Sequence, residues 1–198
     1  MALGRPEPSK VPFHTTFPTT FGQCALAWRD AALVGTALPG IDDAATILAA
    51  IRTCPDAVAA PPPAWVADLV ARIQSLLAGE PIHFTDVPLS LDRANPFERE
   101  VYRAASAIPH GDTRTYGELA TEIGRPGAAR AIGRALGRNP VPIVIPCHRI
   151  LAADGRTGGF SAPGGVSTKM RLLQIERARG GAQASLFDLS WEAAPIRR

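Results

Sequence analysis

Asn-Pro-Val-Pro-Ile-Val-Ile-Pro-Cys-His-Arg-Ile, residues 139–150, is the stretch on which the interpretation of this chain depends. Prolines surround a short apolar run and directly precede Cys147, which His148 follows. Because proline fixes its own φ angle and has no N–H for a sheet ladder, we expect a rigid backbone at the cysteine. Two interpretations are open at this point: a buried thiol beside a surface histidine, or a reactive thiol with its base.

A reactive Cys147 requires a neighbouring base. Only the thiolate is nucleophilic, and free cysteine has a pKa of about 8.5. His148 is the candidate base, directly or through a water, and its second ring nitrogen then needs an acceptor that fixes its tautomer. Glu176, at the end of the helical pattern Lys-Met-Arg-Leu-Leu-Gln-Ile-Glu at 169–176, is the candidate for this third group.

Two short helices are predicted upstream of the cysteine. Thr115 and Glu118 have the spacing of a capping box, and the helix that they open ends at Gly124. After Arg-Pro-Gly at 125–127, an Ala-rich helix is predicted over 128–136, and the pair is a helix-turn-helix candidate. Small residues on the second helix favour close approach to a phosphate chain: Ala128, Ala129, Ala131 and Gly133.

The distribution of charge favours a polyanionic partner. The 198 residues carry a formal net charge of only +3. Residues 1–92 hold five Lys or Arg against nine Asp or Glu, whereas residues 93–180 hold fourteen against seven. A basic second half beside an acidic first half is a pointer to a polyanion as the partner.

The first half is predicted to be a small α/β unit without a cluster of active-site residues. Its expected elements are an irregular arm at 1–20, a β-hairpin at 22–38, a helix at 42–52, a Pro/Ala linker at 55–63, a helix at 65–76 and a strand at 83–89. The second half opens with Asn95, Pro96 and Glu98, which predict a capped helix that continues to Ile108.

Composition excludes several classes of protein. Hydrophobic residues make up 46% and charged residues 20%, and no apolar run approaches the length of a membrane span. The first twenty residues lack an apolar signal core, so we expect a cytoplasmic protein. Cys24, Cys54 and Cys147 form no Cys-x-x-Cys pair and the histidines lack ligand spacing, so no disulfide framework and no metal site is expected.

Together the motifs resemble those of the O6-alkylguanine-DNA alkyltransferases, the methylated-DNA–protein-cysteine methyltransferases. Pro-Cys-His-Arg at 146–149, after Asn-Pro and an Ile/Val run, is similar to the active-site signature of this family. Residues 115–120 are similar to its first DNA-domain helix, 128–133 to its recognition helix, and 169–176 to its closing Lys-x-x-Leu-Leu-x-x-Glu motif. Four motifs in the family's order across 93–178 make the resemblance specific, while the first half is more loosely similar.

The resemblance implies a chemical role for individual residues. Cys147 is expected to attack the alkyl carbon on guanine O6 and to keep the alkyl group permanently, and a relay of Cys147, His148 and Glu176 is expected to produce the thiolate. Tyr116 is expected to donate to the leaving guanine. Asn139 is similar to the family asparagine that braces the turn before the strand that carries the cysteine.

The resemblance also implies how DNA is bound. The partner would be double-stranded DNA containing O6-alkylguanine, with O4-alkylthymine as a second substrate class, and the target nucleotide would be flipped out of the duplex. Arg130 would fill the vacated stack while the recognition helix lies in the minor groove. The implied DNA-binding residues are Arg130, Ala128, Ala129, Ala131, Gly133 and Arg149. We expect a monomer without metal or cofactor, because the cysteine is itself the acceptor.

The loop that lines the pocket departs from the family's Gly-Tyr-x-Gly-Gly pattern. It reads Gly-Phe-Ser-Ala-Pro-Gly-Gly at 159–165, so Phe160 keeps an aromatic wall without the hydroxyl, and Ala162-Pro163 is an insertion. Both changes bear on the range of substrates rather than on the displacement. The residues expected to line the substrate pocket are Tyr116, Ile150, Phe160 and Ser161.

We therefore expect an α+β fold. Residues 1–92 would form the N-terminal α/β domain with its hairpin, residues 93–178 a mostly helical domain with a winged-helix-like helix-turn-helix that binds DNA and transfers the alkyl group, and residues 179–198 a disordered tail.

Three other functions are compatible with parts of the pattern. A lesion-binding protein would flip alkylguanine and flag it for another repair pathway without repairing it, but Cys147 argues against this. A transcriptional regulator would use Cys147 as a methyl-phosphotriester sensor, but the sequence shows no second helix-turn-helix and no Cys-rich sensor domain. A Cys-His hydrolase would need an oxyanion hole and a route for the water that deacylates the enzyme, and no motif in the sequence indicates either.

Overall fold

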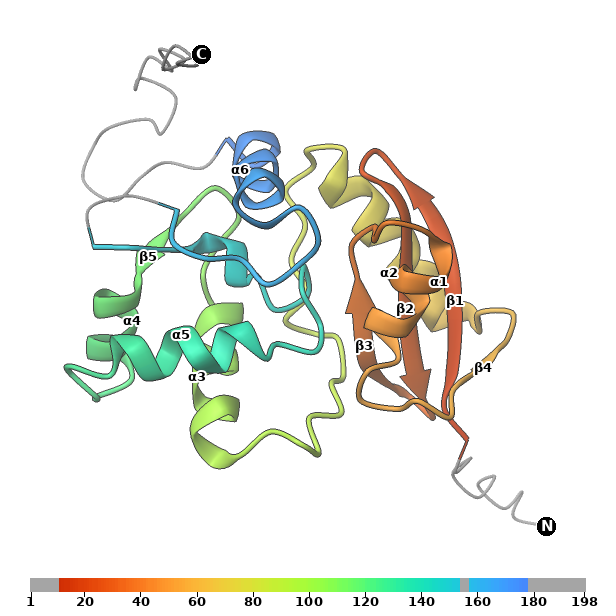
Figure 1. The fold of residues 1–198 in the computed structure, drawn as a ribbon, viewed down its shortest axis with the longest axis horizontal. Coiled ribbons are helices and arrows are strands. Elements are labelled where there is room, and N and C mark those ends of the chain that lie inside the picture. The colour runs from red at the N-terminus through yellow and green to blue at the C-terminus, as the bar shows by residue number, and fades with distance from the viewer. Residues whose placement is uncertain (1–10, 154–156, 178–198) are drawn as a thin grey trace, which may run out of the picture.

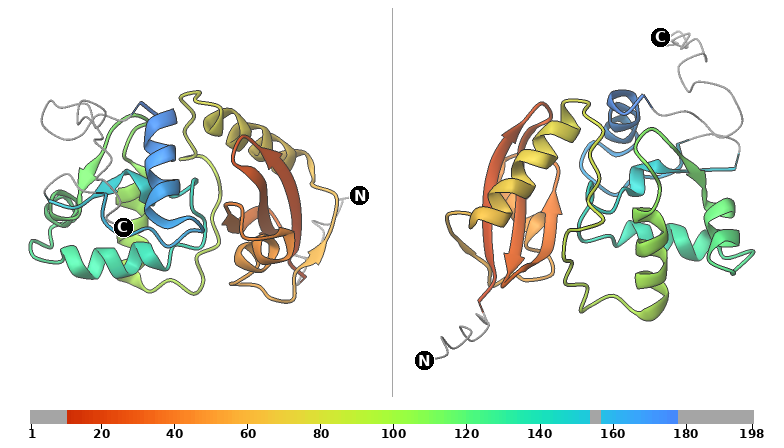
Figure 2. Two further views of the ribbon diagram at one scale, coloured as in Figure 1. Left: turned by 45° about the horizontal axis from the view of Figure 1, so that its top comes forward. Right: turned by 180° about the vertical axis from the view of Figure 1, so that it is seen from behind.

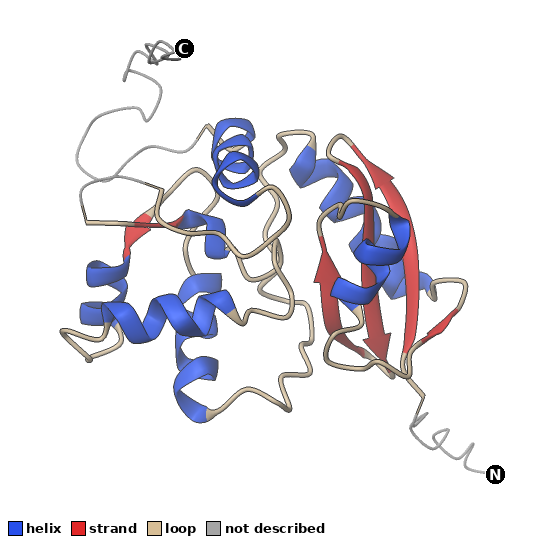
Figure 3. Ribbon diagram, viewed as in Figure 1, coloured by secondary structure: helices blue, strands red, loops and turns tan. Residues whose placement is uncertain are grey.

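The computed structural model describes residues 11–153 and 157–177 and sets a four-stranded sheet beside a group of helices (Figure 1). Most of the helices gather on the side of the molecule away from the sheet, as Figure 3 shows. The α+β class that the sequence predicts is confirmed. The division at residues 92 and 93 remains a proposal, and the tail at 179–198 lies outside the described residues.

The sheet is built from the first sixty residues in the order β3-β2-β1-β4. The hairpin expected at 22–38 is present as β2 (Gly22–Arg29) and β3 (Ala32–Ala37), which pair antiparallel. The irregular arm expected at 1–20 is wrong from residue 13 onward. There β1 (Phe13–Thr19) pairs antiparallel with β2 along its whole length, and β4 (Val58–Ala59) pairs parallel with the first two residues of β1. Threonine and phenylalanine favour the pleated backbone, and the buried Phe17 anchors this strand in the core.

Two helices cover opposite faces of the sheet, α1 (Asp43–Ala50) on one and α2 (Ala64–Leu77) on the other (Figures 1 and 2). Successive side chains of a strand point to opposite faces. Ala25 therefore packs with α1, whereas Leu26 joins the large cluster that contains the apolar side of α2. The side-chain oxygen of Asp42 accepts from the N–H of Ala45 at 2.7 Å and caps α1, which confirms a helix within the expected range 42–52.

Gly35 sets how closely α1 approaches the sheet. A Cβ atom at this position would lie 1.8 Å from the carbonyl oxygen of Ala50. We expect Gly35→Ala to lower the free energy of unfolding by about 1–3 kcal/mol, because helix or strand must shift. Urea unfolding measures this difference. At Gly137, where a Cβ would meet nothing within 4 Å, the same substitution is the control, and equal midpoints for the two variants would contradict the prediction.

The strand expected at 83–89 is not formed. Only an isolated bridge between Leu33 and Leu89 is present there. Pro81 and Pro88 offer no N–H, and the side chain of Arg72 donates to the carbonyl of His83, so this segment crosses from the sheet to the helices as a loop.

The second half is mostly helical and shares its core with the first. Its elements are α3 (Pro96–Ser106), α4 (Tyr116–Glu122), α5 (Ala129–Gly137), α6 (Gly165–Ile175) and a short parallel pair of β5 (Arg114–Thr115) and β6 (Ile150–Leu151). Both predicted capping boxes, at Asn95 and at Thr115, are present. One buried apolar cluster runs from Leu26 in the sheet to Leu172 in α6, so the two halves pack as one unit.

The sheet also holds the segment that leads to the cysteine. The N–H of Thr36 in β3 donates to the carbonyl of Pro140 at 3.1 Å, and its hydroxyl donates to the carbonyl of Pro142 at 2.6 Å. The first half therefore braces residues 140–142 from outside the helical half. Among the described residues, no helix is long and apolar enough to cross a membrane.

Candidate active site

Cys147 opens a short 3-10 helix, Cys147–Arg149, rather than lying on a strand as the sequence suggested. The prolines of the preceding segment prevent a regular ladder, and Ile143 adopts a φ of 77°, in the left-handed region. Asn139 closes the turn, because its side-chain nitrogen donates to the carbonyl of Ile145 at 2.9 Å and its oxygen accepts from the N–H of Val141 at 3.0 Å. The cysteine is thus held on a rigid turn, as expected.

The thiol of Cys147 is almost completely buried, and burial raises its pKa above the usual value. The side chain of Asn139 and the positive charge of Lys169 act in the opposite direction without cancelling the effect of burial. The thiol is therefore protonated at neutral pH. A nucleophilic Cys147 needs a base to remove this proton.

His148 and Glu176 form the contact that the sequence predicted. Nε2 of His148 lies 3.0 Å from Oε1 of Glu176, and both side chains are fully buried. Burial acts to raise the pKa of Glu176, but the charges and hydrogen bonds of His148 and Arg149 outweigh it and lower the pKa. Glu176 is therefore ionised, and it orients the imidazole. Nδ1 of His148 makes no hydrogen bond within the described part of the chain and is available to accept a proton.

A cavity of about 380 Å³ opens at the thiol. The side chains and glycines that line it come from α4, α5, the cysteine turn and the loop before α6: Tyr116, Gly133, Leu136, Gly137, Cys147, Gly159, Phe160 and Ser161. Burial, and next the thiol of Cys147, raise the pKa of Tyr116. Its hydroxyl therefore stays protonated and can donate a hydrogen bond to a molecule in the cavity.

The chain is similar to proteins of known activity. A methylated-DNA–protein-cysteine methyltransferase of Mycobacterium bovis is 44% identical over 128 residues, which are 65% of this chain and 75% of the relative. The chain belongs to the methylated-DNA–protein-cysteine methyltransferase family.

Two further comparisons agree with this membership. The family model described as 6-O-methylguanine DNA methyltransferase, DNA binding domain, matches residues 96–178. The crystal structure of Mycobacterium tuberculosis OGT in complex with DNA superposes with a TM-score of 0.67 and 35% identity, covering 83% of this chain and 92% of that chain. The resemblance read from the motifs is therefore confirmed, and so is DNA as the partner of this methyltransferase.

The two helices of the predicted helix-turn-helix are present as α4 and α5, which pack against each other. Arg130 is exposed, and the small residues around it, Ala128, Ala129, Ala131 and Gly133, are half-buried. Gly133 also lines the cavity that contains Cys147, so a molecule that approaches this face of α5 comes close to the thiol.

Two of the residues assigned from the sequence lie elsewhere. Arg149 was expected on the DNA-binding face, but it is buried: Nε and Nη2 donate to the carboxylate of Glu176 at 2.9 and 2.8 Å, and Nη1 donates to the carbonyl of Ile108. With its donors engaged inside the protein, it cannot reach DNA. Ile150 was expected in the pocket, but on β6 it is fully buried and is not among the residues that line the cavity.

Lys169 is a site residue that the sequence analysis left without a role. It is fully buried, and its ammonium donates to the carbonyls of Ile150 and Thr157, which ties the loop beyond Thr157 to β6. Burial lowers its pKa to about 8, and the thiol of Cys147 acts in the opposite direction. The only signal in the sequence was its place in the closing motif at 169–176.

We expect Lys169→Met to raise the pKa of Cys147, because the variant removes the buried cation that favours the thiolate. The measurement is the pH dependence of the rate at which iodoacetamide alkylates Cys147, followed by peptide mass mapping. The midpoint should move to higher pH than in the wild type. Lys169→Arg, which keeps the charge, is the control, and an unchanged midpoint in Lys169→Met would contradict the prediction.

Proposed function

We propose that Cys147 is the alkyl acceptor of this DNA-repair methyltransferase and takes the methyl or alkyl group from O6 of guanine in double-stranded DNA. The observation that carries the proposal is a buried thiol at the wall of a cavity, on the turn that leads directly to the His148–Glu176 pair. The sulfur–carbon bond that forms is stable, so each molecule acts once and needs no cofactor. A monomeric state and a cytoplasmic location remain predictions.

The proton of the thiol leaves through His148. Nδ1 of His148 accepts it through a water, while Nε2 stays hydrogen-bonded to Glu176, whose charge stabilises the imidazolium that forms. Arg149 holds the same carboxylate in place. The buried ion pair of Glu176 and Arg149 therefore acts on the thiol through the imidazole, and only Cys147 bonds to the alkyl group.

The thiolate attacks the alkyl carbon in line with the C–O6 bond. The sulfur–carbon bond forms as the C–O6 bond breaks, and the electron pair of that bond returns to guanine. Tyr116 donates its hydroxyl proton to the guanine ring, so that the base leaves as a neutral molecule, and the phenolate that remains takes up a proton from water. The hydroxyl of Tyr116 can do this because its raised pKa keeps it protonated.

The target base reaches the cavity by flipping out of the DNA duplex. Flipping costs about a few kcal/mol of unstacking, and Arg130, exposed near the start of α5, is the side chain that fills the vacated position. The small residues of α5 let the backbone of the helix approach the minor groove closely. Alkylated guanine is the lesion that this arrangement suits.

We expect Tyr116→Phe to slow alkyl transfer about a hundredfold, because the variant loses one donor at the site where charge develops on guanine. The measurement is the single-turnover rate of methyl transfer at saturating protein. Duplex binding should stay close to that of the wild type, since the phenyl ring keeps its place in the wall of the cavity. An unchanged transfer rate would remove Tyr116 from the mechanism.

The proposed function is tested by intact-protein mass after mixing with a duplex that carries one O6-methylguanine. We expect a gain of one methyl group, about 14 Da, that peptide mapping assigns to Cys147, and no gain with the same duplex lacking the lesion. Tight and selective binding of the lesion without any gain of mass would instead support a protein that marks alkylguanine for another repair pathway. If the protein neither prefers the lesion in binding nor gains mass, both functions are refuted.

A further inference from the structure

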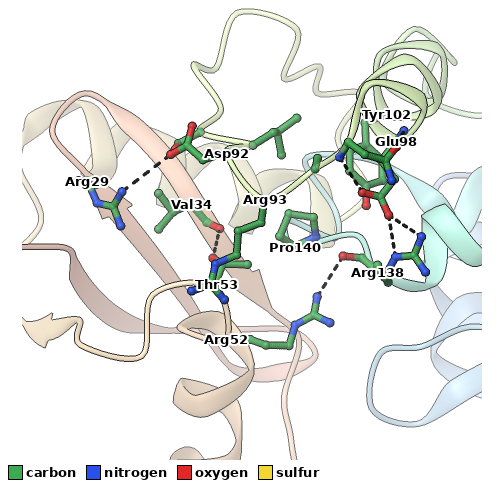
Figure 4. A pocket seen from close by; sticks show the side chains of 14 residues that line it. Arg29, Val34, Arg52, Thr53, Asp92, Arg93, Glu98, Tyr102, Arg138 and Pro140 are labelled. Carbon is green, nitrogen blue, oxygen red and sulfur yellow. Dashed lines mark hydrogen bonds and ion pairs between the residues drawn. The ribbon is translucent and has the colours of Figure 1, made fainter.

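A second cavity, of about 700 Å³, lies between the sheet and the helices. It shares no lining residue with the cavity at Cys147. Figure 4 shows side chains that converge on it from the end of β2, the turn after α1, the loop before α3, α3 itself and the end of α5. Its charged lining residues are Arg29, Arg52, Arg93, Arg138, Asp92 and Glu98.

The charges in this cavity do not balance. Arg29 faces Asp92 at 3.8 Å, and Arg138 pairs with Glu98 at 2.6 Å. Glu98 is also committed to the cap of α3 through the N–H of Asn95. Each acidic side chain is therefore matched by one arginine. The two remaining arginines of the cavity leave it with a net positive charge.

Arg93 and Arg52 are these two uncompensated cations. Arg93 makes no hydrogen bond or ion pair with any residue that the structure describes, and in Figure 4 it extends from its loop between the two ion pairs. Arg52 donates from Nη2 to the carbonyls of Arg138 and Asn139, at 3.2 and 3.1 Å. These bonds hold its guanidinium in one orientation, and Nε and Nη1 have no hydrogen-bond partner in the part of the chain that the structure describes.

One more donor in the cavity has no acceptor. Nε of Arg29 is buried and lacks a hydrogen-bond partner among the described residues, although the side chain as a whole is 35% exposed. A buried donor without an acceptor is costly unless a ligand satisfies it. Several guanidinium forks that face one space offer the paired N–H donors that suit the oxygens of a phosphate.

We propose that the cavity lined by Arg29, Arg52, Arg93 and Arg138 binds a phosphate group. The group is either part of the DNA backbone outside the helix-turn-helix or a free phosphate. The first source is suggested by α5: Arg130, Arg134 and Arg138 are exposed and recur every fourth residue, so they form a stripe from the start of the helix to the cavity.

Arg93→Ala tests the site with least disturbance, because the side chain makes no hydrogen bond within the described chain. Arg103→Ala is the matched control: Arg103 is an exposed arginine on α3 that does not line the cavity. Fluorescence anisotropy with an unmodified duplex, repeated over a series of salt concentrations, gives the affinity and its salt dependence. If the DNA backbone is the source, Arg93→Ala should lower the affinity about tenfold. The slope of log K against log salt should then fall by about 0.9.

A second arm distinguishes the free ligand. Inorganic phosphate is titrated into the wild type, Arg93→Ala and Arg103→Ala, and binding is followed by NMR of the arginine Nε–H groups. Saturable shifts that Arg93→Ala removes, with an unchanged DNA salt slope, would identify a free phosphate as the source. No difference between Arg93→Ala and Arg103→Ala in either arm would overturn the proposal. Neither readout requires methyl transfer, so failure of the transfer reaction would leave the result for this cavity intact.

Discussion

Cys147→Ser is expected to abolish methyl transfer completely while duplex binding persists. The serine hydroxyl is far harder to ionise than the thiol, and in this buried position the relay through His148 does not produce an alkoxide at neutral pH. Intact mass after mixing with an O6-methylguanine duplex measures the loss of transfer. Anisotropy with the same duplex measures binding, which in the proposed function depends on α5 rather than on the sulfur.

A second buried cysteine, Cys54, supplies the control for this variant. Cys54 is buried beside α1 and is not among the residues that line the cavity at Cys147, and burial raises its pKa. Cys54→Ala should transfer the methyl group as the wild type does. A mass gain of one methyl in Cys147→Ser would contradict the proposal, because it would place the acceptor on another residue.

Glu176→Gln is expected to have the second largest effect, on both rate and stability. Without the carboxylate, the imidazolium of His148 is not stabilised and its tautomer is not held, and we expect single-turnover transfer to slow about a thousandfold. The same change leaves the buried guanidinium of Arg149 without its counter-charge. We therefore expect the free energy of unfolding to fall by about 3–5 kcal/mol. Rapid-quench kinetics and urea unfolding measure the two quantities.

The pH dependence of stability identifies the carboxylate as the cause. The pKa of Glu176 is lowered in the folded protein, so its contribution is present above the pKa of the unfolded chain, about 4.3, and is lost as the pH falls below it. The difference in unfolding free energy between wild type and Glu176→Gln should narrow on acidification. A difference that does not change with pH would show that packing, rather than charge, explains the loss of stability.

Local patterns predicted those parts of the fold in which partners are a few residues apart. The capping boxes at Asn95 and Thr115 depend on contacts over three residues, and the hairpin turn at Asp30 depends on its neighbours. The rigid turn at Cys147 follows from the prolines in front of it. These elements are visible in the sequence because their energies depend mainly on nearby residues.

The errors concern residues whose environment comes from far along the chain. Arg149 looks like a surface cation in the sequence, but Glu176 and the carbonyl of Ile108 enclose it. The segment at 83–89 has the composition of a strand, but Pro88 and the hydrogen bond from Arg72 to the carbonyl of His83 keep it a loop. Burial is decided by packing between distant segments, which hydrophobic periodicity does not report.

By itself, the sequence determined the family, the α+β class and the two short helices before the cysteine, and it places His148 directly after Cys147. Only the tertiary structure decided that Lys169 lies close enough to Cys147 for its charge to act on the pKa of the thiol. It also decided that Arg149 binds Glu176 inside the protein, and that four separate segments bring their arginines to one cavity. The physical reason is distance along the chain. Short-range backbone preferences act between neighbours, whereas electrostatic contacts and burial form only when the folded chain brings distant residues together.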